Sequence, residues 1–175
     1  MLKIMKNGIV FVLLIVLFCS DSVASFADAY RDVKAISRSV GFVVSGPIGD
    51  VSMDILYDPK NPDSLAHANE IFDAISNDTS EGKVNFIGRK ITSPSDSTSK
   101  VIFLTRGTQG MYDYALEKAA ENAGITVSND KNCLGVGCVL VVKTDLYVDI
   151  AISTELAKQL GVKFSSAFRM IVTKR

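Results

Sequence analysis

The sequence predicts an α/β fold, in which a single domain has three layers: a mostly parallel sheet, with helices on both faces and a C-terminal antiparallel hairpin. Two strand–helix–strand units follow one another between residues 51 and 128, which is typical of a parallel sheet covered by helices. After residue 138 two strands meet at a tight turn, which indicates antiparallel pairing. The chain has 175 residues, enough for one such domain with a buried core.

The first unit is preceded by a helix predicted over 27–43, where apolar residues recur at steps of three and four. A largely buried strand follows at 51–58, and a helix with an asparagine–proline start is predicted at 62–76. The strand at 83–91 completes the unit. The predicted buried stripe of the second helix consists of Leu65, Ala68, Phe72 and Ile75.

The second unit follows a polar loop at 92–99. A compact, β-branched strand at 100–105, a helix at 111–124 that ends on a glycine, and a short strand at 125–128 make up this unit. We therefore expect the sheet to be parallel up to residue 128.

The remaining elements are a hairpin over 138–153 that turns at 143–145, and a helix at 154–160 that a glycine ends. The last segment, 162–172, is predicted as a strand or an irregular edge segment. The apolar residues of the hairpin (Val148, Ile150, Ile152) or the terminal "AFRMIV" can form a dimer edge, although core packing explains both more simply.

The N-terminus has the layout of a secretory signal peptide. Two lysines precede an unbroken apolar run at 9–18, and small residues surround possible cleavage points after Ala24 or Ala27. The run is shorter than the roughly 20 residues that a transmembrane helix needs. We predict a signal peptide at 1–24 followed by one domain at 25–175.

Charge and residue types exclude several classes of function. The chain has 19 basic and 19 acidic residues with no basic run, so nucleic acid is not an expected partner. The single histidine, His67, is expected on the solvated side of its helix. A Ser-His-Asp or Cys-His site would need this histidine in a pocket, and one histidine with Cys133 and Cys138 falls short of the four ligands of a closed zinc site. We therefore expect no enzyme activity, no metal and no cofactor.

The segment "RGTQG" lies between a buried strand and a helix, where open α/β sheets bind ligands. Thr105, Arg106, Thr108 and Gln109 can hold a carboxylate or phosphate there, and Asp58 lies at the equivalent junction of the first unit. The alternative is that a strand-to-helix junction simply needs a glycine turn.

Two cysteines, Cys133 and Cys138, frame a glycine-containing loop. The third cysteine, Cys19, lies in the predicted signal peptide, so the exported chain has an even number of cysteines, which favours a disulfide. The spacing is not the C-x-x-C of thiol-disulfide oxidoreductases. The glycines allow the two Cα atoms to approach within ~6 Å, and a disulfide across so short a loop adds about 2 kcal/mol of stability. We predict a structural disulfide that clamps a turn before the hairpin; a redox-active pair is the second alternative.

The segment "GITVSNDKNCLGVGCVLVVKTDLYVDIAISTELAKQLGVKFSSAFRMIV" resembles the YfiR-type periplasmic regulators, most closely in its tail at 148–172. The stretch "VSMDILYDPKNPDSLAHANEI" is instead similar to half of a periplasmic solute-binding protein. The YfiR resemblance implies a small periplasmic α/β protein. Members of that family restrain an inner-membrane diguanylate cyclase through its periplasmic domain, and redox state or an outer-membrane partner modulates them.

Two functions therefore stand side by side. The first is a non-enzymatic periplasmic regulator that contacts the periplasmic domain of an inner-membrane signalling protein and acts on cyclic-di-GMP signalling. The second is a single-lobe periplasmic binding protein for a small anion or carboxylate, with its site at Asp58 and residues 105–109.

Overall fold

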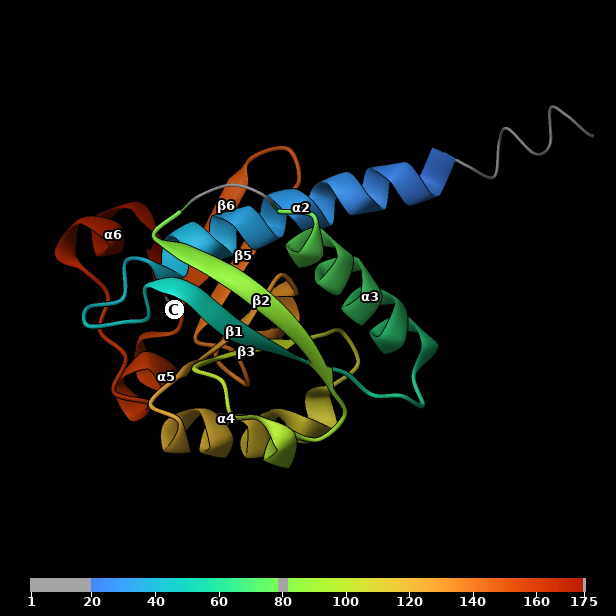
Figure 1. Cartoon of the computed structure of the whole chain (residues 1–175). Coiled ribbons are helices and arrows are strands. Elements are labelled where there is room, and N and C mark those ends of the chain that lie inside the picture. Colours follow the sequence, from blue (N-terminus) through green and yellow to red (C-terminus); the bar gives the residue numbers. More distant parts are fainter. Residues whose placement is uncertain (1–19, 79–81, 175) are drawn as a thin grey trace, which may run out of the picture.

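The computed structural model describes residues 20–78 and 82–174, with side chains from residue 27 onward. The predicted fold class is confirmed: a mostly parallel sheet carries helices and an antiparallel C-terminal hairpin (Figure 1). The predicted signal peptide lies almost entirely outside the described residues. The elements in chain order are α2 (Ser20–Val40), β1 (Gly49–Leu56), α3 (Pro62–Ser76), β2 (Val84–Ile91), η1 (Pro94–Asp96), β3 (Val101–Leu104), η2 (Gln109–Met111), α4 (Tyr112–Glu121), β4 (Ile125–Ser128), η3 (Lys131–Cys133), β5 (Leu140–Thr144), β6 (Val148–Ile152), α5 (Thr154–Gln159), α6 (Ser166–Ile171) and β7 (Thr173–Lys174).

Within the described residues the sheet has seven strands in the order β2-β1-β3-β4-β5-β6-β7. The first five strands of this order are parallel, and β6 runs antiparallel to β5 with Leu140 opposite Ile152. The chain moves from β1 outward to β2 and then returns to β3 on the other side of β1. This reversal is a topological switch point, and its carboxyl end is where such sheets bind ligands.

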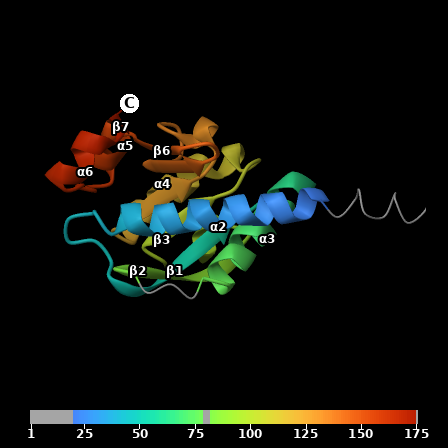
Figure 2. The same cartoon turned by 90° about the horizontal axis from the view of Figure 1, so that it is seen from above.

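Neighbouring residues of β3 pack on opposite faces of the sheet. Val101 and Phe103 belong to the core that α2 and α3 cover, whereas Ile102 and Leu104 pack with α4. Figure 1 shows α2 and α3 above the sheet and α4 below it, so the three predicted layers are present. Figure 2 shows α2 lying lengthwise across the sheet, with α6, β7 and the C-terminus grouped near the end of α2.

The predicted stripe of α3 is wrong at its N-terminal end. Leu65 is 38% exposed, while Ser64 and His67 are buried. The helix is rotated because these two polar side chains reach the end of β3. Ser64 Oγ lies 2.8 Å from Thr105 Oγ1, and His67 accepts a backbone hydrogen bond from Arg106. A satisfied polar pair can replace a leucine at a buried position because its hydrogen bonds offset the cost of desolvation.

The connection from β4 to β5 also differs from the expectation. The strand at 125–128 is not the last parallel one, because β5 pairs with β4 in parallel. Residues 129–139 are therefore a crossover, which in most parallel sheets contains a helix. Here a 3-10 turn and a disulfide fill that place, and Cys133 and Cys138 pack beside α4.

The C-terminal segment contains a helix, α6, rather than only a strand or irregular edge. Ser165 caps it, since its Oγ accepts a hydrogen bond from the backbone N–H of Phe168 at 3.3 Å. Phe168 is buried, and its ring lies 5.0 Å from that of Phe42 and 5.3 Å from that of Phe164. Phe42 lies beyond α2, which ends at Val40 and not at residue 43 as predicted. These aromatic contacts hold the last helix against the end of α2.

Candidate functional site

A hollow of about 310 Å³ lies at the carboxyl ends of β3, β4 and β5, beside the switch point. We call it the charged hollow. It is lined by Arg106, Asn129, Asp130, Lys131, Lys143 and Asp145. Its position is that of the ligand crevice in open α/β sheets, and its volume suits a molecule of about amino-acid size.

Each basic side chain of the charged hollow lies close to a carboxylate. The pairs are Arg106 with Glu70 at 3.8 Å, Lys131 with Asp149 at 2.8 Å, and Lys143 with Asp145 at 3.1 Å. The hydrogen bond and charge of Asp149 raise the pKa of Lys131. Exposed pairs of this kind contribute at most about 1 kcal/mol each, so a ligand that offers both charges can replace them at small cost.

The hollow is built on a buried carboxylate, Asp32 of α2. Its oxygens accept hydrogen bonds from the backbone N–H and the hydroxyl of Thr144, both at 2.7 Å, and from the Asn129 amide at 2.7 Å. Lys143 Nζ lies 3.6 Å away. Asp32 thus ties α2 to the ends of β4 and β5. Asp32 lies four residues before Ile36, on the buried face of the helix. A charged residue at such a position is almost never buried without a partner, so the sequence did contain a signal for this polar contact.

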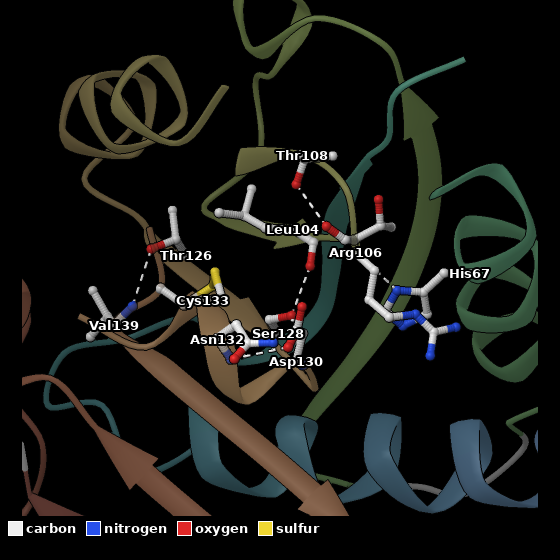
Figure 3. Close-up of a disulfide and its surroundings, with 12 residues drawn as sticks. His67, Leu104, Arg106, Thr108, Thr126, Ser128, Asp130, Asn132, Cys133 and Val139 are labelled. Carbon is white, nitrogen blue, oxygen red and sulfur yellow. Dashed lines mark hydrogen bonds between the residues drawn. A yellow bond between two sulfur atoms is a disulfide. The ribbon is translucent and has the colours of Figure 1, made fainter. Parts of the chain in front are cut away.

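His67 is the second buried group at this edge, and the expectation of a solvated histidine is wrong. It is 2% exposed, packs edge-on against Phe103, and accepts a hydrogen bond at Nδ1 from the Arg106 backbone N–H at 3.0 Å. Burial and the charge of Arg106 lower the pKa of His67 to about 3, against a smaller opposing effect of a hydrogen bond with Asn129. The neutral ring therefore fixes the backbone from which the Arg106 side chain extends (Figure 3).

The residues predicted to bind an anion take different roles. Arg106 lines the charged hollow, but the hydroxyls of Thr105 and Thr108 are buried and donate to backbone carbonyl oxygens at 2.9 and 2.7 Å. Asp58 accepts a hydrogen bond from the backbone two residues later, at 2.9 Å, and Gln109 is exposed in η2. The threonines thus shape the junction. Of the five residues, only Arg106 is brought to the hollow with the later lysines, and a ligand-binding role for the other four stays a prediction.

The Cys133–Cys138 disulfide is present, with Cα atoms 5.2 Å apart, and both residues are fully buried. Gly135 has φ of 78°, which favours glycine, and the Tyr112 ring packs so closely on Gly137 that an added Cβ would lie 2.4 Å from it. In Figure 3, Cys133 lies next to Asn132, on the far side of Ser128 from His67. Burial of both sulfurs favours a structural clamp over a redox-active pair.

In the described part of the chain, no group of three or more histidine, cysteine, aspartate or glutamate residues is placed to hold a metal ion. Nor does any helix within residues 20–78 and 82–174 have the length and apolar character that crossing a membrane requires.

No family model and no curated protein matches the sequence. Solved structures do match its fold. A conserved domain protein from Vibrio cholerae O1 biovar El Tor str. N16961 superposes with a TM-score of 0.58 and 11% identity, over 83% of this chain and 59% of that one. The ABC domain in complex with L-Trp from Streptococcus pneumoniae superposes with a TM-score of 0.56 and 10% identity, over 84% of this chain and 60% of that one. A third match is the ligand-free, open structure of CD0873, a substrate-binding protein with adhesive properties from Clostridium difficile. It superposes with a TM-score of 0.54 and 11% identity, over 82% of this chain and 58% of that one.

The chain thus spans about three-fifths of the length of these structures. At 10–11% identity this likeness establishes a shared fold.

Proposed function

We propose that this chain is an exported, non-enzymatic binding protein that takes a small zwitterionic ligand of the amino-acid class in the charged hollow. The mixed charge of the hollow carries the proposal: three cations and two carboxylates surround a space of about 310 Å³ at the carboxyl ends of the strands. A simple anion would meet Asp130 and Asp145 as well as the cations. A zwitterion pairs with both signs, so the anion expected from the sequence is refined to a molecule that carries a carboxylate and an ammonium group.

The solved structures support this proposal by analogy. One of them holds L-Trp, which is a zwitterion, and another is a substrate-binding protein. The chain matches about three-fifths of each of these two structures. Because Arg106, Lys131 and Asp145 of the charged hollow are exposed, we expect affinity in the micromolar to millimolar range, weaker than that of an enclosed pocket.

Isothermal titration calorimetry with amino acids, neutral sugars and inorganic phosphate tests the ligand class. We expect heat and thermal stabilisation with one or more amino acids only. Arg106→Gln should weaken binding about tenfold, the loss expected for one charge-assisted hydrogen bond. Arg31→Gln is the matched control, because both arginine side chains are 55% exposed and each has one carboxylate neighbour.

Binding of sugars alone, or equal binding by the two arginine variants, would refute a zwitterion site in the charged hollow. Absence of any binding across the panel would refute the ligand-binding function itself. Circular dichroism of both variants separates loss of a contact from loss of fold.

A second candidate function, the YfiR-type regulator, is favoured by the tip of the β5–β6 hairpin. Three consecutive apolar residues there are exposed: Leu146 by 98%, Tyr147 by 72% and Val148 by 60%. Such a cluster at a loop tip is typical of a protein contact. We infer that, if the chain restrains an inner-membrane diguanylate cyclase, this tip is the part that contacts the periplasmic domain of the cyclase.

Co-purification with a membrane protein that carries a diguanylate cyclase domain tests this candidate, together with cellular cyclic-di-GMP. Tyr147→Asp should abolish capture and raise cyclic-di-GMP, while Tyr114→Asp, at a 66% exposed tyrosine on α4, should do neither. Equal capture by both variants would contradict the hairpin contact.

Sedimentation of the purified protein tests the homodimer. Its edge is the part of β6 that precedes Ala151, because β7 does not pair with that part.

Export is proposed from the sequence and tested by fractionation with N-terminal sequencing. A cut after Ala24 or Ala27 keeps the buried residues Ala29, Val33, Ile36 and Val40 of α2 in the mature chain. Recovery of the chain from the periplasm with either new N-terminus is the expected result. Recovery from the cytoplasm with residues 1–24 attached would contradict it.

A further inference from the structure

A larger cavity, of about 510 Å³, lies at the opposite end of the sheet from the charged hollow. We call it the apolar pocket. It lies between α5, α6 and the segment after α2, next to Ile152, which pairs with the first residue of β5. Figure 1 shows α5 and α6 together at this end, away from the loops that follow β1 and β2. Its hydrocarbon wall is formed by Val44, Ile152, Ala157, Val162 and Phe164.

The charges around the apolar pocket have one sign. Lys158, Lys163 and Arg169 line it, and among its described lining residues there is no aspartate or glutamate. Within residues 20–78 and 82–174 none of the three cations takes part in an ion pair, unlike those of the charged hollow. Three unneutralised cations around a hydrocarbon wall create a local positive potential that attracts an anion.

The apolar pocket continues into a second hollow of about 230 Å³. The two share Val44, Gly161, Val162 and Lys163. The lining of the second hollow includes Pro47, Ile125 and one more cation, Lys100. Because the two hollows are adjacent, a ligand with a tail can occupy both, which a compact anion such as phosphate cannot.

We propose that the apolar pocket binds a free carboxylate with an aliphatic tail, of which a medium-chain fatty acid is the simplest example. The carboxylate lies among Lys158, Lys163 and Arg169, where it gains charge-assisted hydrogen bonds. The tail lies against Val162 and Phe164 and extends toward the second hollow, where burial of each methylene group strengthens binding. The site is distinct from the charged hollow and does not depend on the function proposed for it.

Calorimetric titration of the purified full chain with decanoate tests the proposal, with acetate and decanol as probes that each lack one half of the ligand. We expect saturable binding of decanoate with one site, and at least about tenfold weaker binding of each partial probe, as loss of about 1.4 kcal/mol or more requires. Arg169→Gln should weaken decanoate about tenfold and leave decanol unchanged. Val44→Glu, at a position 54% exposed, should weaken decanoate by repulsion without disturbing the core.

Lys60→Gln is the control, because it removes one exposed cation from the loop that follows the carboxyl end of β1. Equal binding of decanoate and decanol, or an unchanged affinity in both Arg169→Gln and Val44→Glu, would overturn the proposal. The proposal would also be overturned if the protein sedimented with phosphatidylglycerol vesicles but gave no calorimetric response to free decanoate. That result would assign the cations to contact with a membrane surface.

Discussion

At the carboxyl ends of β3, β4 and β5 each basic side chain of the charged hollow lies within 4 Å of a carboxylate. At the other end of the sheet, Lys158, Lys163 and Arg169 surround a hydrocarbon wall with no acidic side chain among the described lining residues. The same domain therefore offers two different environments. One end suits a ligand that can exchange both charges, and the other suits an anion with an apolar part.

The two ends also differ in what supports them. A buried polar network, centred on Asp32 and His67, holds the charged hollow. Packed aromatic rings, centred on Phe168, hold the apolar pocket. Hydrogen-bond networks depend on every partner and on pH, whereas hydrocarbon packing depends on volume. The expected effects of substitutions follow from this difference.

The largest effect is expected at the apolar end, from Phe168→Ala. Phe168 is 1% exposed and contacts two other rings, so its loss should cost about 3–5 kcal/mol of unfolding free energy. Urea unfolding followed by circular dichroism measures the loss. Met170→Ala, at a position 79% exposed on the same helix, is the control and should change stability by less than about 0.5 kcal/mol. Similar losses in both variants would mean that α6 is not held by its buried ring.

The next largest effect is expected at the charged end, from Asp32→Asn. The amide keeps the volume but loses the charge and can accept fewer of the hydrogen bonds from Thr144 and Asn129, so we expect a loss of about 2–3 kcal/mol. Asp145→Asn removes an exposed neighbour of the same Lys143 and should cost less than about 1 kcal/mol. If chemical denaturation gave the same value for both, Lys143 rather than the buried network would be the main support of the hollow.

The sequence predicted the features that rest on a repeated pattern better than those that depend on single contacts. Strand–helix alternation specified the parallel order through 128 and the location of Arg106 at a carboxyl end. It did not place His67, because whether a polar residue at the edge of a helical stripe is buried depends on its partner, which here is a backbone N–H 39 residues away. Asp32 was missed for the same reason, since its partner Thr144 lies 112 residues along the chain.

The apolar pocket was missed because α6 was expected as a strand or an irregular edge. The local pattern of "VKFSSAFRMIV" contains alternating and clustered apolar residues that suit either structure. This segment forms a helix because Ser165 supplies the N-cap and Phe168 the buried contact. The cysteine loop was recognised as a clamp, but its role as a parallel crossover required the pairing of β4 with β5.

Removal of the disulfide tests how far the two ends are coupled, since residues 129–139 run from the charged hollow to the start of β5. Cys133→Ala with Cys138→Ala should lose about 2 kcal/mol, as expected for so short a loop, and should weaken ligand binding at the hollow more than decanoate binding. Thermal unfolding and the two titrations measure this. Because both sulfurs are buried, the wild-type disulfide should resist mild reductant in the folded state. Rapid reduction at neutral pH would instead support the redox-active alternative.

The last effect separates the two ends by pH. His67 in the unfolded chain takes up a proton near pH 6.5, whereas in the folded protein its pKa is about 3. Between these values the unfolded state binds more protons, so the stability present above pH 6.5 is lost as the pH falls, by up to about 1.4 kcal/mol per unit. His67→Gln does not titrate, and its amide oxygen can still accept from the Arg106 backbone. Urea unfolding between pH 7 and 5, where few carboxylates titrate, should therefore show a slope in the wild type that the variant lacks. Parallel pH profiles of the two proteins would show that the histidine is not held neutral, and the charged hollow would then lack its pH-sensitive support.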